Sequence, residues 1–77
     1  MMSDNTKKHV GERLQRFREI RGLSVAVLAL KLGISEKDLE DIEAGKAELT
    51  TDMIEILREA FSLDPAWLLG GQVPEPS

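Results

Sequence analysis

Hydrophobic residues recur at helical spacing along most of this 77-residue chain. In the first segment, Val10, Leu14 and Phe17 follow the i, i+4, i+7 spacing of one helix face. Thr6 is the predicted N-cap of this helix, because its hydroxyl can accept a hydrogen bond from an unpaired amide in the first turn. Gly22 is well placed to end the helix in a left-handed conformation.

Two short helical patterns follow between Ser24 and Gly45, each opened by a serine. Gly33 separates them and permits a sharp turn with positive φ. Ser35 with Asp38 three residues later is a variant of the capping box, so the second of these helices is predicted to begin at residue 36. This arrangement is typical of a helix-turn-helix. The predicted core positions are Leu28, Ala29 and Leu32 in the first helix, and Leu39 and Ile42 in the second.

The remaining pattern predicts two more helices. Thr50 or Thr51 caps the fourth, and Asp64 followed by Pro65 opens a short fifth. The predicted core positions of the fourth helix are Ile54, Leu57 and Phe61, and the fifth helix is predicted to run through Trp67, Leu68 and Leu69. No strand pattern or repeat is present, so we expect an all-α fold of five helices. We expect residues 10–71 to form this domain, between a mobile arm (1–9) and a flexible tail (72–77).

The composition excludes several classes of function. The chain has no cysteine and one histidine, and so lacks the ligands of a clustered metal site. It also lacks a phosphate-binding loop and a nucleophile paired with an activating histidine, so we expect no enzymatic activity, no metal and no cofactor. No apolar run approaches the roughly 20 residues that span a bilayer. Residues 1–10 lack the apolar core of a signal peptide, and we expect a cytoplasmic protein.

Charge is unevenly distributed along the chain, whose formal net charge is -4. Residues 1–22 carry six Lys or Arg against three Asp or Glu, whereas residues 23–77 carry four against eleven. An acidic domain repels the phosphate backbone overall, so any binding to nucleic acid must come from a local basic patch.

Several pieces of the sequence together resemble the Cro/C1-type, or Xre-type, helix-turn-helix proteins over about residues 10–71. They are GERLQRFREIRGLS, Ala29 followed by Gly33, Leu39 and Ile42, IEAGK where the family commonly has IExGK, and LDPAWLLGG. The resemblance implies a five-helix lambda-repressor-like DNA-binding domain, with the helix at residues 36–44 in the DNA major groove of a dimer's site. It also implies a partly buried ion pair between Arg18 and Glu43 that joins the first and third helices.

The surface of this recognition helix departs from the family pattern. The base-reading candidates are Ser35, Glu36, Lys37, Glu40 and Asp41. Family members typically carry groups here that can donate to guanine or adenine, whereas a carboxylate can accept from the cytosine amino group. Three carboxylates between phosphate strands also repel one another and the DNA. A solvated acidic helix face is therefore an alternative interpretation.

Phosphate contacts are expected from the basic residues that surround the motif. The candidates are Lys7, Lys8, Arg13, Arg16, Lys31 and Lys46. Three or four such contacts would give weak, salt-sensitive binding. Charges on the first helix can equally form a solvated face, or pair with Glu12 and Glu19 at helical spacing.

The helix after Ser24 is the second departure, since Val25 and Val27 stand where many members have polar residues. Aligned with the family, Val25, Val27 and Leu30 face solvent and form a candidate protein interface, unless this helix is more buried here.

Two candidate functions follow from these observations. The first is a DNA-binding transcriptional regulator that acts as a homodimer on double-stranded DNA. The alternative is a helix-turn-helix scaffold that has lost DNA binding and binds a protein partner through an apolar second helix and an acidic third helix.

Overall fold

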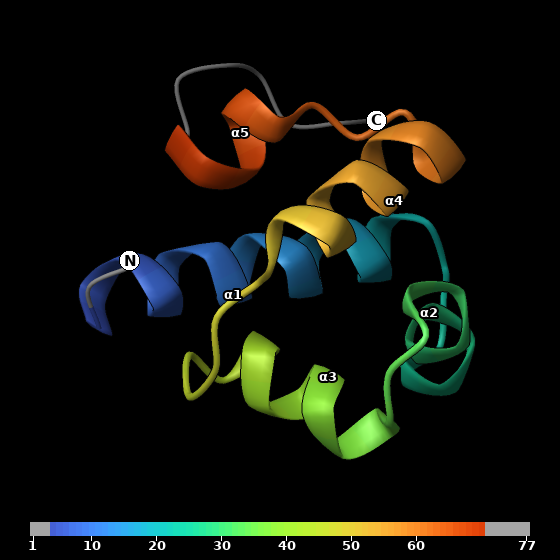
Figure 1. Cartoon of the computed structure of the whole chain (residues 1–77), viewed down its shortest axis with the longest axis horizontal. Coiled ribbons are helices and arrows are strands. Elements are labelled where there is room, and N and C mark those ends of the chain that lie inside the picture. Colours follow the sequence, from blue (N-terminus) through green and yellow to red (C-terminus); the bar gives the residue numbers. More distant parts are fainter. Residues whose placement is uncertain (1–3, 71–77) are drawn as a thin grey trace.

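The computed structural model describes residues 4–70 of the chain, and the side chains of residues 5–69. The helices are α1 (Asp4–Ile20), α2 (Val25–Leu32), α3 (Glu36–Glu43), α4 (Thr51–Phe61) and α5 (Pro65–Gly70). Over this range there is no strand, and the prediction of an all-α fold is confirmed. Helix α1 runs through the middle of the fold, with α3 on one side and α4 and α5 on the other (Figure 1).

Helix α1 begins earlier than its sequence pattern predicts. It starts at Asp4, so Thr6 is not its N-cap, and residues 4–9 are helical instead of part of an arm. The start of the helix packs against the turn after α3, where a Cβ on Gly45 would lie 2.8 Å from the Cα of Lys8. Residues 1–3 of the expected arm, and the expected tail at 72–77, lie outside the described residues.

The predicted N-caps of the next three helices are confirmed. In each, the side-chain oxygen accepts a hydrogen bond from the backbone N–H three residues later, at 3.0 to 3.2 Å. These caps are Ser24 for α2, Ser35 for α3 and Thr50 for α4. Gly33 ends α2 with a φ of 72°, a left-handed conformation that costs glycine no steric clash. The turn between α2 and α3 is therefore formed as the sequence predicts.

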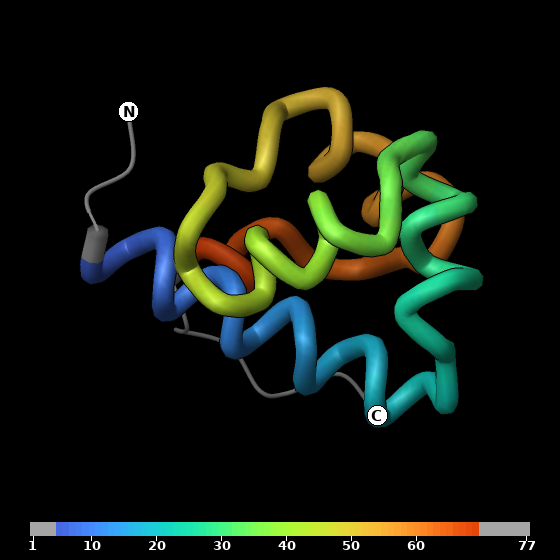
Figure 2. Tube along the Cα trace, turned by 90° about the horizontal axis from the view of Figure 1, so that it is seen from below, coloured from blue at the N-terminus to red at the C-terminus, as the bar shows by residue number. Residues whose placement is uncertain are grey.

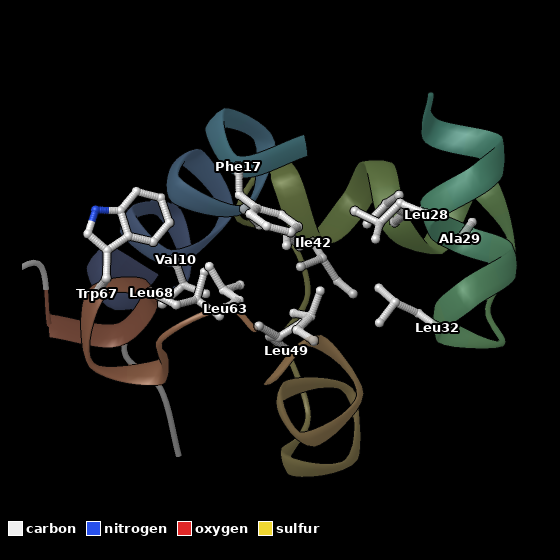
Figure 3. Close-up of a cluster of buried hydrophobic side chains, with 13 residues drawn as sticks. Val10, Phe17, Leu28, Ala29, Leu32, Ile42, Leu49, Leu63, Trp67 and Leu68 are labelled. Carbon is white, nitrogen blue, oxygen red and sulfur yellow. The ribbon is translucent and has the colours of Figure 1, made fainter. Parts of the chain in front are cut away.

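All five helices contribute side chains to one hydrophobic core (Figure 3). The core positions predicted in α2 and α3 are buried. In α4, Leu57 is buried, whereas the predicted positions Ile54 and Phe61 are half-buried and pack against the core. Two loop residues, Leu49 and Leu63, are buried although no helical pattern points to them. The buried residues are Val10, Leu14, Phe17, Leu28, Ala29, Leu32, Leu39, Ile42, Leu49, Leu57, Leu63, Trp67 and Leu68.

Candidate nucleic-acid interface

The Arg18–Glu43 ion pair that the resemblance implies is present and ties α1 to α3. Arg18 Nε donates to Glu43 Oε2 at 2.9 Å, and Nη2 donates to Oε1 at 3.2 Å. Both side chains are largely buried, and Arg18 Nη1 also donates to the carbonyl oxygen of Leu23 at 3.1 Å. The hydrogen bond to Glu43 raises the pKa of Arg18 above its ordinary value. This bidentate pair fixes the C-terminal end of α3.

A second contact, not predicted from the sequence, brings the backbones of α1 and α3 together. A Cβ on Gly11 would lie 2.6 Å from the carbonyl oxygen of Glu43 and would also clash with that of Ile42. Only glycine allows so close an approach. The signal was an isolated glycine inside a helical pattern, which often has a packing reason. Helix α3 is therefore held on α1 by the ion pair and by close backbone packing.

The outer face of α3 is left exposed by this arrangement. Glu36, Lys37 and Glu40 are exposed, and Asp41 is half-buried. Lys37 Nζ lies 3.3 Å from Asp41 Oδ2, an exposed pair of the kind that contributes little to stability. Ser35 is occupied as the N-cap, since its Oγ accepts from the backbone N–H of α3. The structure thus places all five base-reading candidates along one short helix, with carboxylates dominating.

Three exposed lysines lie near the two ends of this acidic helix. Lys46 follows the Gly45 turn at the C-terminal end of α3, and the backbone of Lys8 packs on that same turn. Lys31 lies in the last turn of α2, just before the Gly33 turn that leads into α3. Cations placed in this way can meet phosphates on both sides of a helix that lies in a groove.

The other phosphate candidates are placed differently. Arg13 Nη1 donates to the carbonyl oxygen of Trp67 at 3.1 Å, and its Cζ lies 5.3 Å from the centroid of the indole ring. Arg16 lines a hollow with the same tryptophan, and Lys7 is half-buried. Because α5 and α3 lie on opposite sides of α1 (Figure 1), Arg13 belongs to the packing of α5 and does not join the lysines around α3.

The candidate protein interface on α2 is only partly as expected. Val25 is half-buried and packs against the core, so it does not face solvent. Helical spacing explains the partial burial of Val25, because this residue lies on the same side of α2 as the buried Leu28 and Ala29. Val27 and Leu30 lie on the opposite side and are 42% and 79% exposed. The exposed apolar surface is therefore formed by these two residues without Val25.

Within the part of the chain that the structure describes, no group of three or more His, Asp or Glu is placed to hold a metal ion. No helix in the same part is long and apolar enough to cross a membrane. The fold provides two capped helices, α2 and α3, which are joined at the left-handed Gly33. Helix α3 is held firmly on α1, and its outer face is exposed. This arrangement defines a helix-turn-helix protein.

The comparisons with known proteins agree with this class. The model of the helix-turn-helix domain family matches residues 11–72, and the chain belongs to that family. No solved structure matches the chain. A helix-turn-helix domain suggests a DNA-binding regulator.

Proposed function

We propose that the chain is a small Xre-type transcriptional regulator that binds double-stranded DNA as a homodimer. The observation that supports this best is the placement of Lys8 and Lys46 at one end of α3 and Lys31 at the other. The acidic helix then enters the major groove while the lysines contact the backbone on either side. Each phosphate that is neutralised releases counterions, which offsets part of the repulsion between the carboxylates and the DNA.

The test is a titration of the full chain with random duplex DNA at low and high salt. We expect binding at low salt that falls steeply as salt rises. Replacing Lys46 with Gln should weaken binding to all sequences and reduce the salt slope by about 1. The matched control is Arg58→Gln, because Arg58 is an exposed cation of α4 that lies on the far side of α1 from α3. Absence of binding at low salt, or equal weakening by Arg58→Gln, would contradict the proposal.

A second candidate function has one specific observation in its favour. Leu30 is 79% exposed and lies beside the exposed Val27, and the neighbouring α3 is acidic. A helix-turn-helix scaffold that binds a basic and apolar protein partner would use such a surface. The DNA titration separates the two functions, since a scaffold that has lost DNA binding gives no complex with duplex at any salt concentration.

A further inference from the structure

Helix α2 is apolar around almost its whole circumference. Its inner side is buried in the core, while Val27 and Leu30 on the opposite side are exposed. A helix that is hydrophobic all round is normally covered on every side, and neighbouring exposed apolar residues mark an interaction surface. We call this surface the α2 outer face; it consists of Ala26, Val27, Leu30 and Lys31.

We propose that a second copy of this chain covers the α2 outer face, with the two α2 helices packed antiparallel about a twofold axis. Val27 of each copy then lies opposite Leu30 of the other, and Ala26 lies opposite Lys31. Each large apolar side chain of the face is paired with another, as an isologous interface requires. The small side chain of Ala26 leaves room for the aliphatic stem of Lys31, while the ammonium group of Lys31 stays in solvent at the rim of the interface, where a phosphate can still reach it.

Charge favours this antiparallel arrangement of two copies. Lys31 makes the C-terminal end of α2 basic. The N-terminal end borders a hollow that Val25 lines together with Arg18, Glu40 and Glu43. Arg18 and Glu43 neutralise one another, so the exposed Glu40 makes that end acidic. In an antiparallel pair the basic end of each helix lies by the acidic end of the other, and the two helix dipoles also oppose one another. In a parallel pair, like charges would meet.

The position of α2 in the molecule makes the pair compatible with DNA binding. Helix α2 lies at one end of the longest axis and is seen almost end-on in Figure 1 and lengthwise in Figure 2. The twofold axis of an antiparallel pair is perpendicular to both α2 helices and to the line that joins them. In Figure 1 this axis is vertical. Helix α3 of both copies then faces the same side. A parallel pair would put the two α3 helices on opposite sides, so this choice of orientation rests on the proposed function.

The dimensions of the molecule fit the same arrangement. Its longest extent is 28 Å, so the centres of two copies that meet end to end lie a similar distance apart. One turn of B-DNA is about 34 Å long, the spacing between half-sites that two recognition helices read. A pair of eight-residue helices buries less than a standard interface, and we expect a weak dimer with a dissociation constant on the order of micromolar or above.

The interface is tested by sedimentation equilibrium of the full chain without DNA over a range of concentrations. We expect a monomer–dimer equilibrium that Val27→Glu and Leu30→Glu each weaken at least about tenfold. Ile20→Glu is the matched control, because Ile20 is also 42% exposed but lies in α1. Circular dichroism establishes that each variant is folded. A chain that stays monomeric, or a dimer that the two α2 variants leave intact, overturns the proposal, as does equal weakening by Ile20→Glu.

The orientation has its own test, because the chain contains no cysteine. Ala26→Cys and Lys31→Cys variants are mixed and oxidised, and we expect the mixed disulfide to form faster than either homodimer. Faster coupling of Ala26→Cys to itself would overturn the antiparallel arrangement. The sedimentation and disulfide tests of the α2 interface do not depend on the result of the DNA titration. A dimer through α2 that binds no duplex rejects the proposed function alone, and a DNA-binding chain whose mass is unaffected by Val27→Glu rejects the interface alone.

Discussion

Gly11 of α1 lies directly against the carbonyl oxygen of Glu43 at the end of α3, so close that a Cβ on Gly11 would lie 2.6 Å from that oxygen. The same two helices are joined by the bidentate pair of Arg18 and Glu43. Helix α3 is short and exposes most of its surface, so these two contacts decide how precisely it is held. The position of a recognition helix must be fixed before its side chains can select a sequence.

Gly11→Ala tests the close approach. Alanine favours an isolated helix by about 1 kcal/mol relative to glycine, yet the added methyl meets backbone atoms that cannot rotate away. Overpacking typically costs about 1–3 kcal/mol, so we expect a net loss of free energy of unfolding. Chemical denaturation measures it, with Glu12→Ala at the neighbouring exposed position as the control. A Gly11→Ala variant more stable than the natural chain would contradict the close contact.

Glu43→Gln tests the ion pair. It leaves the guanidinium of Arg18 largely buried without a countercharge, which costs about 3 kcal/mol for a buried pair. Lys37→Gln removes the exposed pair with Asp41 and should change stability by less than about 0.5 kcal/mol. Equal effects of the two substitutions on thermal unfolding would argue against a special role for the Arg18 pair.

The pH dependence of this pair follows from the raised pKa of Arg18. A basic group whose pKa is higher in the folded state stabilises the fold at any pH below its unfolded pKa, and loses that contribution only as pH rises through the folded pKa. For arginine both values lie far above neutrality. The difference in unfolding free energy between the natural chain and Glu43→Gln should therefore be the same at neutral and mildly alkaline pH. A difference that shrinks between these conditions would contradict this assignment.

The parts of this molecule that follow local rules could be predicted from sequence. The caps at Ser24, Ser35 and Thr50 and the left-handed turn at Gly33 depend on residues within one turn of each other, and all four are as expected. The contact between Lys8 and the Gly45 turn could not be predicted in the same way, because it joins residues that are far apart in the sequence.

The same distinction applies to the candidate site. Helical periodicity alone puts Val25 on the inner side of α2, but alignment to the family pattern suggested that it faces solvent. Arg13 carries no local sign that it packs on Trp67, which lies 54 positions further along the chain. Residue type and spacing therefore identify which side chains are charged or apolar, whereas the tertiary fold decides which of them face a ligand.

Arg13→Met separates a packing role from a phosphate contact. Loss of the cation–π contact and of the hydrogen bond to the Trp67 carbonyl should cost about 1 kcal/mol of unfolding free energy. The salt dependence of DNA binding should stay as it is in the natural chain, in contrast to Lys46→Gln. If Arg13→Met instead reduces the salt slope by about 1 with stability unchanged, Arg13 contacts phosphate.

Glu36→Gln and Glu40→Gln test whether α3 reads bases. Each substitution removes a negative charge from an exposed side chain that the proposed function puts in the major groove. Nonspecific affinity should therefore rise, because repulsion from the phosphates decreases. At the same time the preference for cytosine at the contacted position should fall, since the amide both donates and accepts and a carboxylate only accepts.

Glu59→Gln is the matched control, because Glu59 is an exposed carboxylate of α4, and α4 lies on the other side of α1 from α3. Selection of bound duplexes from a random pool measures both effects. A rise in affinity without any change in sequence preference would show that the carboxylates of α3 only repel DNA, and that specificity comes from other contacts.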